Sequence, residues 1–298
     1  LGEVLKGAKG SGFGSSVTLS GNGRVVGVGS PNFYVSSERT NGLGQEIQMQ
    51  GQVSIFEMTD YGWIQLDEIA TNALGELLSN RLATSLDGRL GLLLALSQDG
   101  RLIVVGIERT DTFRGGAFGF ERNDTSRSYF HSNALLLNDE HLWSMGYDYW
   151  MTSFSLSKSA HMLAFGAIEK FVPEVFVAKY ESDGNGIGEY RLLGEPIPGH
   201  GGIISGNGRL VVVSSEKESP TCQVYYWEER ELLGGNWTER GDPLSGTASA
   251  FSLDGLTLAV SRNDSSIHTF FWNGSQWLHQ GKIMGVLDAS VVISGGQG

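Results

Sequence analysis

The sequence predicts an all-β fold, a β-propeller of four-stranded antiparallel blades, and three observations support this prediction. Glycine makes up 43 of the 298 residues, about twice the roughly 7% of average usage, which suits a chain with many tight turns. A short apolar motif recurs along the chain at intervals typical of propeller blades. Most copies join two apolar runs through Asn-Gly or Asp-Gly, the strongest short signal for a β-hairpin.

A serine marks the hairpin in each copy of the motif. Two clear copies are Ser-Gly-Asn-Gly-Arg at 20–24 and Ser-Gln-Asp-Gly-Arg at 97–101, each lying between apolar runs. Their Asn-Gly and Asp-Gly pairs predict type I′ turns, which need a positive φ at both central residues. The marker serines are Ser20, Ser97, Ser157, Ser205, Ser252 and Ser294.

Two further runs follow most hairpins and complete a four-stranded unit. The predicted third strands are Val53–Met58, Gly116–Glu121, Val175–Tyr180, Val224–Trp227 and Ile267–Trp272. The predicted fourth strands are Trp63–Ile69, Tyr190–Ile197, Trp237–Leu244 and Trp277–Ile283. The inner runs are nearly continuous in Val, Ile and Leu, as expected for strands that are buried on both faces. No unit shows an apolar stripe of period 3.6, so a helical solenoid is disfavoured.

The predicted domain organisation is a single propeller over residues 1–298 with five complete blades and a sixth divided between the termini. The complete units span about 8–70, 84–137, 150–197, 201–244 and 247–283. Residues 1–7 resemble a fourth strand, and residues 284–298 contain a first strand. An innermost and an outermost strand cannot pair directly at the roughly 4.8 Å strand spacing. Either a longer native chain or a partner subunit would have to supply the missing strands.

Short glycine motifs resemble a known propeller family. Phe13-Gly14 is followed by Gly-Val-Gly-Ser-Pro at 27–31, and Phe165-Gly166-Ala167 echoes the pattern. This arrangement resembles the FG-GAP repeat of integrin α-subunit propellers and of related secreted microbial and algal proteins. The resemblance implies an extracellular or cell-surface location and a role in adhesion. WD40-like and TolB-like propellers share the Ser-x-Asp-Gly hairpin.

One acidic loop is the candidate metal site. Glu181, Asp183, Asn185 and Glu189 resemble the calcium loops of FG-GAP repeats, and oxygen ligands suit a hard cation such as Ca²⁺. The same Asp-Gly-Asn-Gly stretch is also a sufficient signal for a turn between the third and fourth strands of its unit. The sequence leaves both interpretations open, and it predicts no other cofactor.

Four Asn-x-Ser/Thr sequons lie where turns are predicted, at Asn123, Asn236, Asn263 and Asn273. Glycosylation of these sites would indicate a secreted glycoprotein. Alternatively, Asn, Ser and Thr stand there only because they form turns.

The Arg-Gly-Asp tripeptide at 240–242 matches the motif that integrins recognise. Its glycine, however, holds the same place in the repeat as Gly194 and Gly281. The repeat therefore explains this tripeptide better than a role as an integrin ligand does.

Charge and missing motifs limit the function. The chain carries 21 Lys and Arg against 33 Asp and Glu, a net charge of −12, so a nucleic-acid partner is disfavoured. Cys222 is the only cysteine, which excludes an intrachain disulfide. No apolar run approaches the roughly 20 residues of a membrane span. The six histidines lack metal-ligand spacing, and neither a Gly-x-Ser-x-Gly motif nor a P-loop occurs.

These observations predict a non-enzymatic extracellular module, structural or adhesive, that presents loops to protein or glycan ligands. Self-assembly with copies of itself, through completion of blades between subunits, is part of this prediction. One alternative is a secreted carbohydrate-active hydrolase with its site in the propeller funnel, where carboxylates distant in sequence would converge. The other is an intracellular interaction scaffold of the WD40 type.

Overall fold

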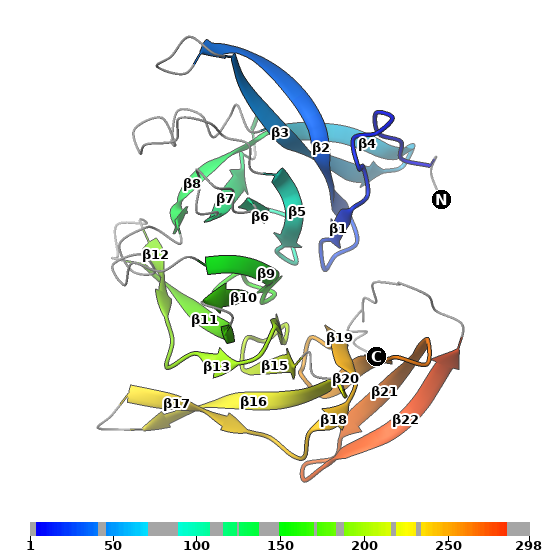
Figure 1. Cartoon of the computed structure of the whole chain (residues 1–298), viewed down its shortest axis with the longest axis vertical. Coiled ribbons are helices and arrows are strands. Elements are labelled where there is room, and N and C mark those ends of the chain that lie inside the picture. Colours follow the sequence, from blue (N-terminus) through cyan, green and yellow to red (C-terminus); the bar gives the residue numbers. More distant parts are fainter. Residues whose placement is uncertain are drawn as a thin grey trace. The chain divides into compact units, whose positions relative to one another are not determined.

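A computed structural model of the chain describes residues 4–40, 46–70, 89–107, 116–123, 125–136, 149–169, 172–182, 188–215, 219–230 and 234–284 (Figure 1). Every regular element in these ranges is a β-strand, which confirms the predicted all-β fold. This part of the chain contains no helix that is long and apolar enough to cross a membrane. The residues divide into two compact units, 1–151 with 183–189 and 152–182 with 190–298.

The first unit contains two antiparallel sets of four strands. The first set comprises β1 (Ser16–Leu19), β2 (Val25–Thr40), β3 (Glu46–Thr59) and β4 (Gly62–Ala70). The second comprises β5 (Arg89–Leu96), β6 (Leu102–Ile107), β7 (Gly116–Arg122) and β8 (Tyr129–Leu136). A short parallel pairing of β3 with β5 joins the two sets into one sheet. Fully buried side chains from the inner strands, such as Val25, Ile55 and Ile103, form a common core between the sets.

The second unit contains three antiparallel sheets, although the first residues of two of their strands, β9 and β12, are assigned to the first unit. The first comprises β9 (Tyr149–Leu156), β10 (Met162–Glu169), β11 (Val172–Ser182), β12 (Gly188–Leu192) and β13 (Ile197–Pro198). The next comprises β14 (Gly201–Ile204), β15 (Leu210–Ser215), β16 (Thr221–Arg230), β17 (Gly234–Glu239) and β18 (Leu244–Ser245). The last comprises β19 (Thr247–Phe251), β20 (Thr257–Arg262), β21 (Ser266–Trp272) and β22 (Trp277–Met284).

The repeated four-stranded antiparallel sets confirm the predicted architecture, and the predicted third strands lie in these sets. The predicted fourth strands Tyr190–Ile197 and Trp237–Leu244 are each interrupted, because β12 and β17 end at Leu192 and Glu239 before β13 and β18 begin. β13 and β18 pair with the third strands β11 and β16 just after the fourth strands end. The number of blades stays a prediction, because 1–3 and 285–298, which would contribute to the sixth blade, lie outside the described residues. The assignment of one domain is likewise untested.

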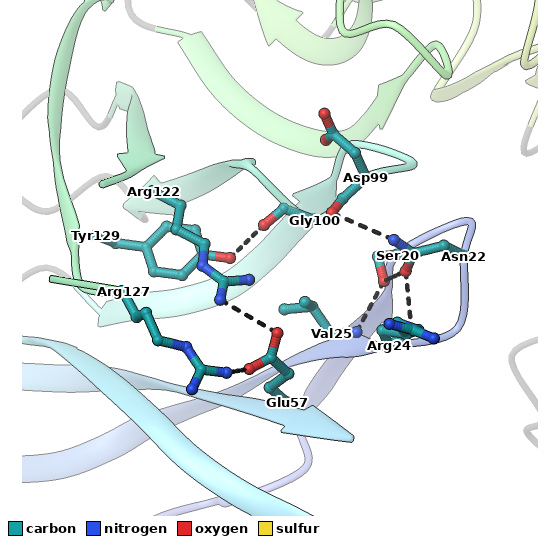
Figure 2. A network of polar contacts seen from close by, with 10 residues as sticks. All are labelled: Ser20, Asn22, Arg24, Val25, Glu57, Asp99, Gly100, Arg122, Arg127 and Tyr129. Atoms are coloured by element: carbon teal, nitrogen blue, oxygen red, sulfur yellow. Dashed lines mark hydrogen bonds and ion pairs between the residues drawn. The ribbon is translucent and has the colours of Figure 1, made fainter. Parts of the chain in front are cut away.

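The hairpins show why serine recurs in the motif. The hydroxyl of Ser20 donates to Oδ1 of Asn22 at 2.7 Å, and the backbone amide of Val25 donates to the same hydroxyl at 2.9 Å (Figure 2). Ser205 makes the equivalent contacts with Asn207 and Leu210, at 2.8 and 3.1 Å. The serine therefore satisfies a backbone amide that the turn would otherwise leave unpaired in the core.

The predicted turn type is wrong. In the described hairpins that contain Asn-Gly or Asp-Gly, only the glycine has a positive φ, for example 70° at Gly23 and 72° at Gly208, and the asparagine or aspartate before it does not. The amide of Gly23 donates to the carbonyl of Ser20 at 2.8 Å, as in a type I turn followed by a left-handed glycine. The connection is longer than the two-residue loop of a type I′ turn, because the side chains of the serine and of the Asn or Asp themselves take part in the turn.

Candidate functional site

A groove of about 1220 Å³ lies within the second unit, at the end of the sheets where the marker hairpins turn. Its apolar wall is formed by Met162, Leu193, Leu210, Tyr226, Trp227 and Trp272. The charged side chains that line it among the described residues are Lys179, Arg209, Glu229 and Arg240. They come from the ends of five strands and from the connections between strands, so the groove exists only once neighbouring sheets are in place.

Two pairs of tryptophans repeat the same geometry in successive sheets. The ring centroids of Trp227 and Trp237 are 5.3 Å apart, and those of Trp272 and Trp277 are also 5.3 Å apart. In each pair the fourth-strand indole N–H donates to a carbonyl at the end of the preceding sheet. Trp237 donates to Leu193 at 2.8 Å and Trp277 to Arg240 at 3.2 Å. Leu193 and Arg240 are therefore equivalent positions of the repeat.

The glycine after each of these positions is required by the rings. Gly194 and Gly241 have φ values of +76° and +75°. A Cβ atom would lie 2.6 Å from the ring of Trp227 at Gly194 and 2.8 Å from the ring of Trp272 at Gly241. The glycine of the Arg-Gly-Asp tripeptide is thus part of the repeat. Gly281, expected at the same place, instead lies within β22 beside a bulge and has no positive φ.

Arg240 is the most distinctive charged residue of the groove. Its guanidinium carbon lies 4.5 Å from the centroid of the Trp272 ring, a cation–π arrangement. The residue is partly buried, and this burial lowers its pKa. An arginine keeps its charge in proteins, so partial loss of solvent strengthens its attraction to an anion rather than neutralising it.

The described residues that line the groove carry a net positive charge, opposite in sign to the charge of the chain. Among the described lining residues, Lys179, Arg209 and Arg240 contribute three positive charges and Glu229 one negative charge, whereas the whole chain has a net charge of −12. A concave site of this sign concentrates anions near it. Aromatic walls with a few charged groups are typical of sites for small organic ligands. The sequence did not single out these residues; only the repeated Leu-Gly and Arg-Gly steps before Glu195 and Asp242 hinted at them.

Of the four predicted calcium ligands, only the side chain of Glu181 lies among the described residues. Glu181 is exposed at the end of β11, with Oε2 3.7 Å from Nη1 of Arg191. Asp183 and Asn185 lie outside the described residues, and so does the side chain of Glu189. In the described part of the chain, no group of three or more His, Cys, Asp or Glu side chains could hold a metal ion. Calcium binding at this loop stays an untested prediction.

The four sequon asparagines are all exposed. Asn123, Asn263 and Asn273 lie in connections between strands, as predicted. Asn236 does not: it lies in β17 opposite Glu228, because this strand begins two residues before it. Glycosylation of these sites stays a prediction.

A scan against known protein families finds no match, and neither does a search of curated proteins. Similar solved structures include a putative 6-phosphogluconolactonase from Bacteroides uniformis, with 13% identity and a TM-score of 0.54 over 92% of this chain and 86% of that one. A periplasmic gluconolactonase from Pseudomonas aeruginosa has 15% identity and a TM-score of 0.50 over 90% and 71%. A putative 6-phosphogluconolactonase from Bacteroides fragilis has 11% identity and a TM-score of 0.50 over 92% and 85%. At these identities the likeness shows the propeller fold alone.

These structures correct two predictions. The FG-GAP resemblance is wrong, because the similar propellers are of the gluconolactonase type. Short glycine steps and Asx-Gly hairpins recur wherever tight turns join the strands of a blade, so they do not separate the propeller families. The non-enzymatic, structural or adhesive interpretation is corrected by the same findings, because these similar structures are a gluconolactonase and two putative 6-phosphogluconolactonases. The absence of a linear catalytic motif does not exclude an enzyme, because a groove of this kind collects residues from strands far apart in the sequence.

Proposed function

We propose that this protein is a hydrolase that cleaves a lactone or ester bond of a carbohydrate bound in the groove. The observation that carries the proposal is the guanidinium of Arg240 over Trp272, beside the cations Lys179 and Arg209. Indole rings offer flat apolar surfaces to the C–H face of a sugar, and the cations suit a reaction whose product is a carboxylate. The propeller fold shared with gluconolactonases supports the same reaction class.

The groove contains groups for both halves of this reaction. Glu229, a carboxylate that lines the groove, would take a proton from water while the oxygen of that water adds to the carbonyl carbon. Arg240 or Arg209 would stabilise the tetrahedral oxyanion. The carbon–oxygen bond of the lactone then breaks, the leaving oxygen takes up the proton, and a hydroxy acid remains. Cys222 is buried in the core, where burial raises the pKa of its thiol to about 12. Attack by water is therefore favoured over attack by a thiolate.

Hydrolysis of a glycosidic bond fits the groove less well. Glycosidases use a pair of carboxylates about 5–10 Å apart, one as acid and one as nucleophile or base. Glu229 is the one carboxylate among the described residues that line the groove. Cleavage of a lactone or ester needs only one base and a stabilised oxyanion, which matches this set of side chains.

We further propose that the protein acts outside the cytoplasm. One similar structure is a periplasmic enzyme, and all four sequon asparagines are exposed. Detection of glycan at any of these asparagines in protein from its native source would support this location.

The reaction is tested by following acid release from D-gluconolactone, D-galactonolactone and a sugar acetate against the uncatalysed rate. We expect Glu229→Gln to lower kcat by about 10²-fold or more. Glu195→Gln, which removes an exposed carboxylate that does not line the groove, should keep full activity. Rates equal to the uncatalysed reaction for all three substrates would reject the proposal.

A further inference from the structure

The repeat places two equivalent aromatic positions in the groove rather than one. Trp227 and Trp272 each lie on a third strand opposite a fourth-strand tryptophan, with ring centroids 5.3 Å apart in each pair, and both line the groove. Each also contacts the glycine of the preceding sheet, at Gly194 or Gly241. A ligand that contacts both tryptophans must therefore extend from one repeat to the next.

The two positions differ in the residue that accompanies the ring. Leu193 precedes Gly194 and packs in the same apolar cluster as Trp227. Its equivalent Arg240 precedes Gly241 and lies over Trp272. The ring is therefore accompanied by an apolar side chain at the first position and by a cation at the second.

The size of the groove agrees with an extended ligand. Its volume of about 1220 Å³ exceeds the roughly 300–1,000 Å³ of sites that enclose one small molecule. A single sugar unit would fill only part of it. Lys179 and Arg209, on β11 and in the β14–β15 hairpin, add positive charge outside the Arg240–Trp272 position.

From this arrangement we infer that the groove binds an acidic oligosaccharide of at least two sugar units. An anionic unit contacts Arg240 and Trp272, and the adjoining unit packs against Leu193 and Trp227. This inference rests on the proposed function in taking the ligand to be a carbohydrate, and it goes further by assigning chain length, charge and the position of each unit. A ligand with two linked units binds more tightly than either unit alone, because the second unit binds without a further loss of translational freedom.

The test is calorimetric titration of the full chain with galacturonate, digalacturonate, trigalacturonate and cellobiose. We expect digalacturonate to bind at least tenfold more tightly than galacturonate and at least tenfold more tightly than cellobiose. The variant Arg240→Leu copies Leu193 of the preceding repeat, so this position already tolerates leucine in the fold. It should weaken digalacturonate binding at least tenfold and leave cellobiose binding within twofold.

Two variants serve as controls. Arg191→Leu removes an exposed arginine that does not line the groove and should leave every affinity unchanged. If Arg240→Leu fails to fold, as judged by its circular dichroism and thermal midpoint, Arg240→Gln replaces it with the same expected loss. Equal binding of galacturonate and digalacturonate, or equal effects of the variants at 191 and 240, would overturn the inference.

The assays separate this inference from the proposed function. Tight binding of digalacturonate without acid release from any lactone or ester would support the inference and reject the hydrolase. Turnover of D-gluconolactone with no preference for digalacturonate over galacturonate would do the reverse.

Discussion

The side-chain amide of Asn207 donates a hydrogen bond of 2.9 Å to the backbone carbonyl of Asp254, and so links the marker hairpins of two successive sheets. Asn22 makes the equivalent bond to Asp99, at 3.3 Å, in the first unit (Figure 2). The backbone amides of the same asparagines donate to Leu253 and Gln98, at 2.8 and 2.9 Å. An aspartate at either position would keep the turn but would lose the side-chain donor to the next hairpin.

We therefore expect Asn207→Asp to lower the free energy of unfolding by about 1 kcal/mol, the net value of one such hydrogen bond. The reciprocal change Asp254→Asn should cost less, because the carbonyl that accepts the bond belongs to the backbone. Urea denaturation of both variants measures the difference. Equal midpoints for Asn207→Asp and the unmodified chain would show that the side-chain bond contributes nothing to stability.

A second prediction separates ring packing from backbone strain. Gly241→Ala places a Cβ at a φ of +75° and 2.8 Å from the ring of Trp272. Gly23→Ala meets a similar φ of +70° with no atom within 4 Å. We expect a loss of about 1 kcal/mol for Gly23→Ala and at least about 2 kcal/mol for Gly241→Ala. Thermal unfolding checks both, and equal losses would mean that the ring moves aside at no cost.

Ala160 should be a stabilising site. It occupies the place of the turn glycine in its hairpin and has a φ of 57°, a conformation that an alanine adopts at a cost. Ala160→Gly should therefore raise the free energy of unfolding by about 0.5–1 kcal/mol. The matched change Ala8→Gly, at an exposed alanine without a positive φ, should lower it. A lower urea midpoint for Ala160→Gly would contradict the assignment of strain to this turn.

The histidine pair of the last sheet predicts a loss of stability in acid. Nδ1 of His268 lies 2.9 Å from Nε2 of His279. Burial, followed by the charges of Arg262, His279 and Lys282, lowers the pKa of His268, and Asp264 opposes this shift. The unfolded state therefore binds more protons than the folded state below the usual histidine pKa of about 6.5. Stability should be at its full value above about pH 7 and fall as the pH drops below 6.5.

The pH effect is measured by urea denaturation at a series of pH values between 5 and 8. We expect His268→Gln to reduce the slope in this range. His161→Gln, at an exposed histidine of the same unit, should leave the slope unchanged. The pairing of β21 with β22 would be shown not to depend on this proton if the His268 variant kept the full slope.

The hairpins could be predicted from the sequence because their signals are local. Serine, Asx and glycine at fixed spacing provide the hydroxyl, the acceptor and the left-handed residue that one turn needs. Local patterns also predicted the third and fourth strands. The turn type could not be predicted from Asn-Gly alone. The side chain of Ser20 or Ser205 hydrogen-bonds to the asparagine of the turn, so the connection is longer than a two-residue loop.

The sequence by itself determined the repeat: all-β strands, their order within each four-stranded set, and the glycine of Arg-Gly-Asp as part of the repeat. Only the tertiary structure decided which side chains meet. Arg240 and Trp272 are 32 residues apart in the sequence, and their contact depends on how the end of one sheet meets the third strand of the next. Sequence periodicity reports which face of a strand is buried, but not which residue of a neighbouring sheet it contacts. For this reason the groove, and with it the proposed function, emerged only from the packed structure.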